Sequence, residues 1–492
     1  MAKALMFAGT SSDSGKSVLA AAFCRILKRR GVRVAPFKSQ NMALNSGVTP
    51  EGHEMGRAQI VQAEAAGIAP HADMNPILLK PTSEMGSQVI VHGVARGNMD
   101  AAAYYENKKQ LWPAVTGSYD RLAAQYDVIV LEGAGSPVEV NLKKNDIVNM
   151  AMAEYADASV VLVADIDRGG VFASIVGTVE LLEPRERQRL SGFIINKFRG
   201  DAGLLRDGLD FIKQKTGFPV LGVVPMLRDL YLPGEDSVAL DRKCLQQPAR
   251  ASALSVGIIR LPHMANYTDF DPLELDPRFS IEYVLSTKSL GGHDVIILPG
   301  SKNVPSDMQF LHTSGLADAL LRYGQAGGRI VGVCGGYQML GRCIRDPHGV
   351  ESKEFREIAG LGLLPITTIF EATKITRRVN AAITLPGLRK PAALDGYEIH
   401  MGRSLLEADG PCHAEECITA GPDGRVWGSY VHGLFDSDDM RDALIAWHCG
   451  SEKVCALSSF SYQAFKEHNY DLLADAVEQH VDVKSILKRM GV

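Results

Sequence analysis

Residues 9–17 of this chain read Gly9-Thr-Ser-Ser-Asp-Ser-Gly-Lys-Ser17, a glycine-rich loop that ends in Gly-Lys-Ser. The apolar run Ala4 to Ala8 precedes this loop, and apolar residues at helical spacing follow it, so the loop joins a predicted strand to a predicted helix. In that context the backbone N–H groups of such a loop surround phosphate oxygens. The stretch therefore predicts a P-loop nucleotide site within an α/β domain.

Several positions in the loop have a predicted part in binding the nucleotide. Lys16 is expected to reach the terminal phosphates, and the hydroxyl of Ser17 is expected to bind Mg²⁺. The other predicted nucleotide-binding residues are Gly9, Thr10, Ser14 and Gly15. Gly9 precedes Gly15 by one residue more than the common P-loop allows. The alternative is a glycine-rich turn that only caps the following helix.

Apolar runs alternate with helical patterns through residues 1–228, which predicts a mostly parallel sheet covered by helices. The candidate strands are Ala4 to Ala8, Val32 to Phe37, Val128 to Leu131, Val160 to Ala164, Gly192 to Ile195 and Val220 to Val224. Open α/β sheets bind their ligands at the carboxyl ends of the strands. The residues at those ends are Gly9, Lys38, Glu132, Asp165 and Asn196.

Two of these strand ends are predicted to belong to the nucleotide site. Glu132 is a candidate Mg²⁺ ligand, and its alternative role is to cap the following turn. Asn196 is expected to present its amide to a nucleotide base. Arg199 stands where guanine-reading sites carry an aspartate, which favours ATP over GTP. Asp165 lies in a comparable position, but several roles are open to it.

A second α/β domain is predicted after a polar linker in which apolar residues recur at neither helical nor strand spacing. Its candidate strands are Ser255 to Arg260, Val295 to Leu298, Arg329 to Val333 and Arg425 to Tyr430. The predicted organisation is therefore an ATP-binding domain over 1–228, a linker over 229–251, a second domain over 252–445 and a helical tail over 446–492.

The second domain contains a candidate nucleophile. Cys334 directly follows the predicted strand Arg329 to Val333, and two glycines and a helical run come next. A sharp strand-to-helix turn of this kind exposes a nucleophile beside N–H groups that point at a developing oxyanion. A histidine usually activates such a cysteine, and His432 follows another predicted strand. The alternative for Cys334 is a small buried apolar residue.

Composition limits the possible partners. The chain has 492 residues, of which 46% are hydrophobic, and a formal charge of −5 with both signs interspersed. This pattern argues against nucleic acid and membrane surfaces as partners. The eight cysteines lack metal-finger spacing, and no apolar stretch reaches membrane-spanning length. A reducing cytoplasm is the expected compartment, and no signal peptide is expected at the start.

The motifs resemble those of known families. The long glycine loop, together with Glu132-Gly-Ala-Gly-Ser, resembles the P-loop of dethiobiotin synthetases. Cys334-Gly-Gly-Tyr-Gln338 resembles the nucleophile elbow of class I glutamine amidotransferases, which implies that Gly335 and Gln338 bind glutamine or its oxyanion. Leu298-Pro-Gly-Ser-Lys-Asn resembles their oxyanion loop, with Gly300 or Ser301 supplying an N–H group. Leu434 stands where most members carry the triad glutamate, so the third triad member is missing or comes from elsewhere.

Five further runs resemble the cobyric acid synthases, a family of cobalamin-pathway amidotransferases. They begin at Phe37, Asp165, Asn196, Asn266 and Tyr397, and the resemblance covers essentially the whole chain. It implies amidation of the b, d, e and g carboxylates of adenosylcobyrinic acid a,c-diamide, with ATP, Mg²⁺, glutamine and a corrinoid substrate and no bound redox cofactor. The alternatives are cobyrinic acid a,c-diamide synthase, or a P-loop nucleotide switch with a non-catalytic amidotransferase-like domain.

Overall fold

The structure, a computed structural model, describes residues 2–81, 86–227, 230–234, 237–244, 252–352, 354–407, 413–415, 417–455 and 457–492. The chain divides into two compact units. The first unit comprises Met1–Ala43, Met55–Pro233 and Phe465–Val492, and the second comprises Leu44–Glu54 and Gly234–Ala464. These units are defined by contacts, so each combines segments that are far apart in the sequence.

The units differ in three respects from the ranges that the sequence predicts. Residues 44–54 belong to the second unit, although they lie within the predicted ATP-binding domain. Residues 465–492 belong to the first unit instead of forming a separate tail. In the predicted linker, Ser237–Cys244 forms helix α9, while residues 229, 235–236 and 245–251 lie outside the described part of the chain.

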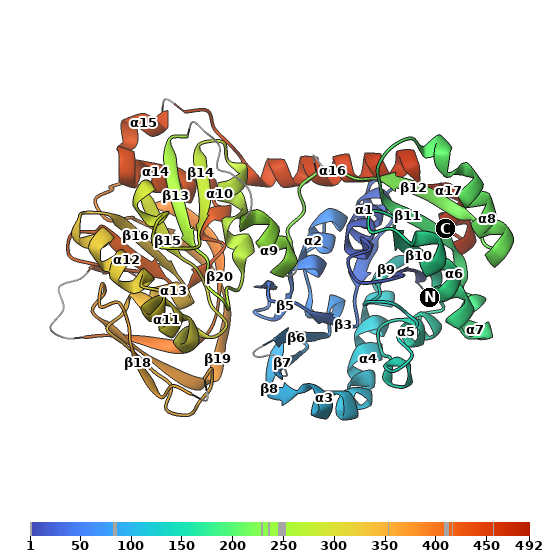
Figure 1. Ribbon diagram of the computed structural model, residues 1–492, viewed down its shortest axis with the longest axis horizontal. Helices are drawn as coiled ribbons and strands as arrows, with labels where there is room; N and C mark the ends of the chain where they lie inside the picture. Colours follow the sequence, from blue (N-terminus) through green and yellow to red (C-terminus); the bar gives the residue numbers. More distant parts are fainter. Residues whose placement is uncertain are drawn as a thin grey trace. The chain divides into compact units, whose positions relative to one another are not determined.

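A six-stranded parallel sheet forms the centre of the first unit (Figure 1). Its strand order is β12-β11-β10-β1-β9-β2. The strands are β1 (Lys3–Gly9), β2 (Val34–Phe37), β9 (Val128–Glu132), β10 (Ser159–Asp165), β11 (Leu190–Phe198) and β12 (Val220–Pro225). All six strands predicted in this half are confirmed. Because every pair is parallel, the carboxyl ends of these strands lie at one edge of the sheet.

Alternate residues of the strands supply the two hydrophobic cores of the first unit. Met6 and Ala8 belong to one buried cluster, and Leu5 and Phe7 belong to the other. This division follows from the strand period of two. The helices are α1 (Lys16–Arg29), α2 (Arg57–Ala66), α3 (Ala101–Asn107), α4 (Trp112–Ala123), α5 (Met150–Tyr155), α6 (Val171–Leu181), α7 (Pro184–Arg187), α8 (Arg206–Thr216), α16 (Tyr462–His480) and α17 (Val483–Met490).

The C-terminal helices α16 and α17 contribute to the first unit's core. Tyr470 and Val477 of α16 are buried in the same cluster as Phe23 of α1. The guanidinium of Arg25 on α1 also binds Glu467 and Asp471 on α16, each at 2.8 Å. This packing explains why the last residues of the chain group with the first.

A smaller sheet of four strands also belongs to the first unit, and the sequence analysis did not predict it. Its order is β3-β6-β7-β8, formed by β3 (Gln40–Met42), β6 (Ile77–Pro81), β7 (Gly86–Val91) and β8 (Val94–Asp100). Between β3 and α2 lie the paired three-residue strands β4 (Ser46–Val48) and β5 (Glu54–Gly56). Strands as short as β3, β4 and β5 contain too few residues to show a period of two.

The second unit is built on a seven-stranded sheet of order β14-β13-β15-β16-β23-β22-β21. It contains β13 (Leu254–Ile259), β14 (Phe279–Val284), β15 (Val295–Leu298), β16 (Arg329–Val333), β21 (His413–Glu415), β22 (Ile418–Ala420) and β23 (Val426–Ser429). The four strands predicted here are β13, β15, β16 and β23. The helices are α9, α10 (Asp271–Leu275), α11 (Val304–Thr313), α12 (Leu316–Gln325), α13 (Gly335–Leu340), α14 (Asp438–Cys449) and α15 (Ser451–Cys455).

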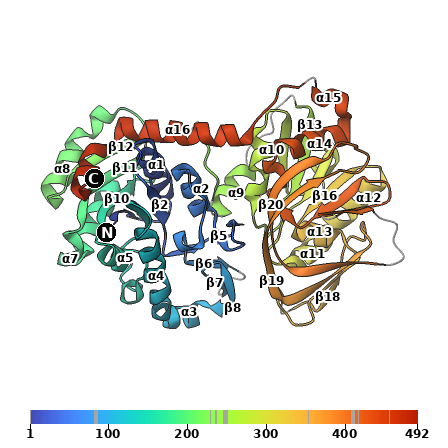
Figure 2. The ribbon, with the colours of Figure 1, turned by 180° about the vertical axis from the view of Figure 1, so that it is seen from behind.

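A second sheet of this unit contains the two longest strands, which lie side by side in both views (Figures 1 and 2). They are β19 (Ile366–Ile383) and β20 (Ala392–Leu406). The order of this sheet is β18-β17-β19-β20-β24, with β17 (Cys343–Arg345), β18 (Glu357–Ala359) and β24 (Val431–His432). The sequence analysis missed this antiparallel pair. Exposed residues interrupt the alternating burial in the middle of β19, so its sequence lacks a sustained period.

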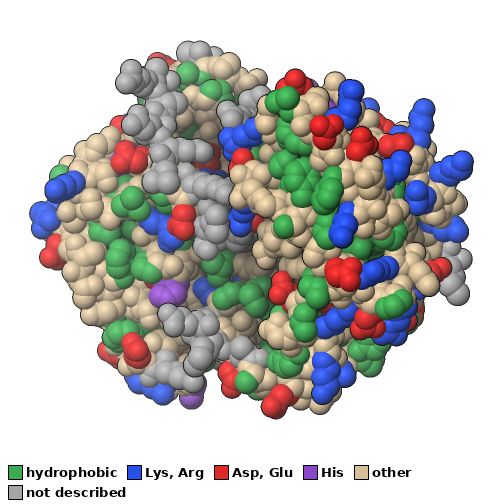
Figure 3. Space-filling model, turned by 45° about the vertical axis from the view of Figure 1, so that its right-hand side comes forward, with side chains coloured by type: hydrophobic (Ala, Val, Ile, Leu, Met, Phe, Trp, Pro, Cys, Tyr) green, Lys and Arg blue, Asp and Glu red, His purple; other side chains and the backbone are tan. Residues whose placement is uncertain are grey.

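Basic and acidic side chains are interspersed over the face drawn in Figure 3. This distribution agrees with the small formal charge of −5. Among the described residues, none of the helices combines the length and the apolar character needed to cross a bilayer.

Candidate functional site

The glycine loop of the first unit runs from the end of β1 to the start of α1. Gly15 adopts φ 97°, a left-handed conformation that favours glycine, and a Cβ at this position would lie 2.0 Å from Nδ2 of Asn196. The backbone N–H of Thr10 donates to the carbonyl of Val163 on β10 at 2.9 Å. The loop is therefore fixed both by its own conformation and by the neighbouring strands.

The side chains of Lys16 and Ser14 have positions in this loop that suit an anionic ligand. The ammonium of Lys16 donates to the carbonyls of Ser11, at 3.0 Å, and Gly135, at 3.3 Å, so it lies within the curve of the loop. The hydroxyl of Ser14 is fully buried and has no hydrogen-bond partner among the described residues. A buried hydroxyl without a partner is costly, and a phosphate oxygen would supply one.

Glu132 at the end of β9 is the acidic centre of this region. Its Oε1 accepts hydrogen bonds from the hydroxyl of Ser17 at 2.8 Å and from the ammonium of Lys38 at 2.7 Å. Its Oε2 accepts one from Nε2 of Gln62 at 2.6 Å. Burial acts to raise the pKa of Glu132, but Lys38 and the neighbouring donors outweigh burial and lower the pKa below its usual value. Glu132 is therefore a carboxylate at neutral pH.

The structure brings together the two predicted Mg²⁺ ligands, Ser17 and Glu132. A hydroxyl and a carboxylate are oxygen ligands of the kind that Mg²⁺ prefers, and Mg²⁺ commonly takes few protein ligands beside substrate phosphates. Within the described residues, no cluster of three or more His, Cys, Asp and Glu side chains is arranged to hold a metal ion. The donor set therefore fits a Mg²⁺ that is held partly by nucleotide phosphates.

The remaining charged residues near the glycine loop pair with one another. The ammonium of Lys197 lies 2.9 Å from Asp165, and Arg199 lies 2.7 Å from Asp167. Nδ2 of Asn196 donates to the carbonyl of Ser14 at 2.9 Å. In this structure Asn196 thus supports the loop, and its role in reading a nucleotide base stays a prediction.

In the second unit, Cys334 occupies the turn between β16 and α13. Its backbone has φ 51° and ψ −106°, a strained conformation for a residue with a side chain. The next two positions have no room for side chains. A Cβ on Gly335 would lie 2.8 Å from the backbone N of Ser301, and a Cβ on Gly336 would lie 2.0 Å from the carbonyl oxygen of Leu298. The Cys-Gly-Gly sequence is thus required by the close approach of the loop after β15.

His432 on β24 lies beside Cys334, since a Cβ on Gly300 would be 3.3 Å from Cε1 of His432 and 3.9 Å from Cβ of Cys334, and its part as the base of this cysteine stays a prediction. Sγ of Cys334 donates to the carbonyl of Ile399 at 3.6 Å, and Nδ1 of the buried His432 lies 2.6 Å from Oδ2 of Asp269. Asp269 is in the short 3₁₀ helix η5 (Tyr267–Phe270), and its Oδ1 accepts the backbone N–H of Gly433 at 3.1 Å. Burial acts to lower the pKa of His432, but Asp269 and Cys334 outweigh it and raise the pKa to about 10.

The sequence analysis left the third member of this constellation open, and Asp269 takes that position in space. It lies 163 residues before His432, whereas the usual triad glutamate follows its histidine by two residues. A signal was present, because Asn266-Tyr-Thr-Asp-Phe-Asp is a polar run soon after a predicted strand. Nothing in the sequence indicated that this run lies beside His432, because the two are far apart along the chain.

The predicted oxyanion residues lie beside the nucleophile. Ser301 has its backbone N next to Gly335, and a Cβ on Gly300 would be 3.3 Å from Cε1 of His432 and 3.9 Å from Cβ of Cys334. The hydroxyl of Ser301 donates to Asp307 at 2.6 Å, which holds the loop on α11. The backbone of this loop and the start of α13 therefore lie close together beside Cys334, and their part in binding an oxyanion stays a prediction.

Gln338 lies one turn further along α13 and is almost fully buried. Its Nε2 donates to the hydroxyl of Tyr430 at 3.3 Å. A Cβ on Gly402 of β20 would lie 2.4 Å from the same nitrogen. Gln338 thus packs between β20 and β23, and its predicted part in binding glutamine stays a prediction.

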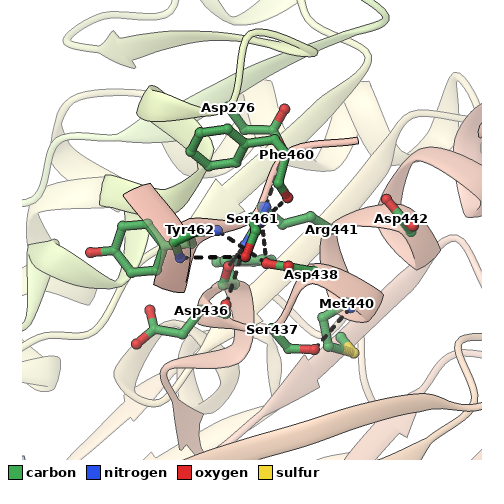
Figure 4. A network of polar contacts seen from close by, with 12 residues as sticks. Asp276, Asp436, Ser437, Asp438, Met440, Arg441, Asp442, Phe460, Ser461 and Tyr462 are labelled. Atoms are coloured by element: carbon green, nitrogen blue, oxygen red, sulfur yellow. Dashed lines mark hydrogen bonds and ion pairs between the residues drawn. The ribbon is translucent and has the colours of Figure 1, made fainter. Parts of the chain in front are cut away.

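A buried arginine on α14, Arg441, lies in a network of polar contacts (Figure 4). It joins the segment just after α10 to the segment that follows His432. Nε of Arg441 donates to Asp276, just after α10, at 3.0 Å. Its Nη1 donates at 2.7 Å to the carbonyl of Phe435, three residues after His432, and its Nη2 donates to Asp438 at 2.7 Å. The side chain of Arg441 is fully buried. It therefore braces the two segments from a position outside the constellation itself.

Two family models match this chain, one in each half of the sequence. Residues 5–237 match the family model for the CobQ/CobB/MinD/ParA nucleotide binding domain, and residues 255–440 match the CobB/CobQ-like glutamine amidotransferase domain. A crystal structure of a glutamine amidotransferase matches with a TM-score of 0.27 and 15% identity, over 41% of this chain and 99% of that one.

Curated relatives match along the whole chain. The cobyric acid synthase of Syntrophobacter fumaroxidans is 54% identical over 100% of this chain and 99% of its own length. That of Yersinia enterocolitica is 51% identical over 99% of this chain and 98% of its own length. The chain therefore belongs to the cobyric acid synthase family, whose members are glutamine-dependent amidating ligases, and the fold and the enzyme class predicted from the sequence are confirmed.

Proposed function

We propose that this protein uses ATP and glutamine to amidate the b, d, e and g side-chain carboxylates of adenosylcobyrinic acid a,c-diamide, giving adenosylcobyric acid. Family membership supports cobalamin-pathway amidation. The choice of carboxylates comes from the sequence resemblance. Each amidation consumes one ATP and one glutamine.

The first unit activates the carboxylate. A carboxylate oxygen takes the γ-phosphoryl group of ATP, ADP leaves, and an acyl phosphate results. Lys16 orients the phosphates and balances their charge, and the buried N–H groups and the hydroxyl of Ser14 complete the cradle. Ser17 and Glu132 would hold Mg²⁺, which supplies charge neutralisation on the phosphates. Ammonia then attacks the acyl carbon, and inorganic phosphate leaves.

The second unit supplies the ammonia. His432 takes the proton of the Cys334 thiol as the sulfur attacks the carboxamide carbon of glutamine, and it gives this proton to the departing ammonia. The N–H groups of Ser301 and Gly335 stabilise the oxyanion of the tetrahedral intermediate. Asp269 orients the imidazole and stabilises its charged form. Water then hydrolyses the thioester and releases glutamate.

The observation that carries this proposal is that one chain contains both constellations. Cys334 beside the hydrogen-bonded His432 and Asp269 suits glutamine hydrolysis, and Lys16 with the Ser17–Glu132 pair suits phosphoryl transfer.

The test is mass spectrometry of the corrinoid product formed with ATP, Mg²⁺ and either glutamine or ammonium. Wild-type enzyme should replace four acids by amides with both nitrogen sources. The variant Cys334→Ser should lose glutamine-dependent product by a factor of roughly 10⁴ or more and keep ammonium-dependent product. Unchanged glutamine use in Cys334→Ser, or no amide formed by the wild type, would refute the proposal.

A further inference from the structure

The second unit includes one short segment from the N-terminal half of the chain, Leu44–Glu54. Its residue Ser46 is fully buried, and the side chain of Val48 packs in a cluster with Tyr397 and Ile399. The hydroxyl of Tyr397 donates to the carbonyl of Ser46 at 3.0 Å. The segment is therefore seated on strand β20, beside the strand that carries His432.

A buried ion pair holds the other side of this segment. The hydroxyl of Ser46 donates to Oε1 of Glu54 at 2.8 Å, and Oε2 of Glu54 pairs with the ammonium of Lys374 on β19 at 2.5 Å. Glu54 is 1% exposed and Lys374 8% exposed. Separating the two partners would leave a buried charge uncompensated, which is strongly destabilising. The pair between Glu54 and Lys374 therefore holds the segment in a single arrangement.

The backbone of Ser46 determines how the amide of Asn266 is oriented. The N–H of Ser46 donates to Oδ1 of Asn266 at 3.0 Å. The oxygen of this buried amide therefore faces Ser46, and its NH₂ group must face the other way. That group, Nδ2, lies 3.4 Å from Nε2 of His432. The backbone of Asn266 has φ 53°, a conformation that asparagine and aspartate tolerate better than other residues with side chains.

The contact has a chemical consequence for the histidine. An amide N–H is a donor only, so it pairs with Nε2 when that nitrogen carries a lone pair and opposes it when the nitrogen carries a proton. Nδ1 already has an acceptor in Asp269. In the neutral ring the contacts on the two nitrogens thus select the same tautomer, with the proton on Nδ1 and the lone pair on Nε2. In the protonated ring, which Asp269 favours, the amide N–H opposes the proton on Nε2.

We infer that Asn266, oriented by the main chain of Ser46, is a positioning residue that sets how readily Nε2 of His432 gives up a proton. When His432 has taken a proton at Nε2, the same N–H group opposes it and favours its transfer to the departing ammonia. The glutaminase centre is therefore complete only when the segment Leu44–Glu54 is seated. This inference rests on the proposed role of Cys334 and His432.

Three other groups that can titrate lie against the imidazole, each on a different element. Asp269 on η5 accepts from Nδ1, and Cys334, before α13, lies close enough to the ring to act on its charge. Tyr397 on β20 stacks on the ring with centroids 5.4 Å apart, while its hydroxyl is bonded to Ser46. Asn266 is uncharged, so replacing it with aspartate adds a second carboxylate beside that of Asp269.

The test is the variant Asn266→Asp in the full-length protein. Aspartate keeps an acceptor for the N–H of Ser46 and tolerates the backbone conformation, but it replaces the donor facing Nε2 with a negatively charged acceptor. Because the added carboxylate stabilises the protonated ring, the acidic limb of kcat/KM for glutamine hydrolysis should move up by about one pH unit or more. kcat should fall at least about tenfold, and ammonium-dependent amidation should stay at the wild-type level.

A matched control exists in the first unit. Asn469 is also buried, and its Oδ1 accepts a backbone N–H, that of Tyr231, while its Nδ2 donates to the carbonyl of Phe465. Asn469→Asp makes the same chemical exchange and should leave the pH profile of glutamine hydrolysis unchanged.

Tyr397→Phe keeps the stacked ring but removes the bond to the Ser46 carbonyl. It should lower kcat by a smaller factor, with KM for glutamine nearly unchanged. A wild-type pH profile and kcat in Asn266→Asp would overturn the inference. If Cys334→Ser is inactive toward glutamine in the same experiments, the proposed function stands even when this inference fails.

Discussion

In the first unit, the consecutive residues Gly9 to Ser17 supply most of the candidate nucleotide site, whereas the residues around His432 in the second unit come from distant parts of the chain. Asp269 precedes His432 by 163 residues, and Asn266 is held by Ser46, which lies 220 residues before it. The phosphate loop is shaped by its own backbone. The site formed by Cys334, His432, Asp269 and Asn266, the thiol centre, depends on contacts among several elements.

The two regions also differ in how their charges are compensated. Around the phosphate loop, Arg199 and Asp167 form a partly exposed pair, and Lys197 pairs with the buried Asp165. The buried pair of Lys38 and Glu132 is supported by neutral donors from Ser17 and Gln62. In the thiol centre, His432 and Asp269 are both nearly fully buried, and each is the charged partner of the other. Removing one partner should therefore cost more there than at the partly exposed pair of Arg199 and Asp167.

The largest effect is expected for Asp269→Asn. This variant keeps the size of the side chain but removes the charge that raises the pKa of His432, and it no longer favours the same tautomer. Steady-state glutaminase assays should show kcat reduced by about 10³- to 10⁴-fold, with ammonium-dependent amidation retained. A reduction of less than tenfold would mean that Asp269 is not the third member of the constellation.

Arg441→Met tests whether the thiol centre depends on a remote brace. The variant leaves the fully buried Asp276 with one donor fewer and frees the carbonyl of Phe435. Urea unfolding, followed by the fluorescence of Trp427 and Trp447 in the second unit, should show a loss of about 3–5 kcal/mol.

The control for Arg441 is Arg425→Met. Arg425 is half exposed and lies 3.9 Å from Asp423, so its loss should change stability by no more than about 0.5 kcal/mol. Equal stability of the two variants would show that Arg441 does not support the second unit.

Lys16→Met tests whether the phosphate loop acts independently of the thiol centre. Without the ammonium, the charge developing on the transferred phosphoryl group is less well stabilised. Amidation should fall by about 10²- to 10³-fold with either nitrogen source. Glutamine hydrolysis measured without ATP should stay at the wild-type level, and a parallel loss of that activity would show that the two centres are not separable.

The smallest expected effect is that of Glu351→Gln. Glu351 accepts the N–H of Val304 at the start of α11, and burial raises its pKa to about 7. The folded state therefore binds the proton of Glu351 more tightly than the unfolded state does, and this adds to the free energy of unfolding at low pH. The wild type loses that contribution as the pH rises from about 4.5 to above 7. The variant should be more stable by about 1 kcal/mol at pH 8 and equal at pH 4.5, as measured by urea unfolding at each pH. A difference that does not change with pH would contradict this.

Much of the fold was predictable because its strands are buried, continuous and apolar. All six strands of the first unit's parallel sheet and four strands of the second unit's main sheet follow from that signal. The pair β19 and β20 was not predictable, because exposed residues and a shift of register between Phe370 and Ile375 break the pattern. Cys334 and His432 were predictable as members of the site, whereas Asp269 was not.

The amino-acid sequence was sufficient to identify the two kinds of chemistry, because a glycine loop and a strand-to-helix cysteine turn are formed by neighbouring residues and need little else to take their shape. It was also sufficient to identify the family. Folding alone brings Asp269 and Asn266 to the two nitrogens of His432 and places Ser46 in the second unit. Such contacts depend on how buried elements pack, and packing joins residues without regard to their separation along the chain.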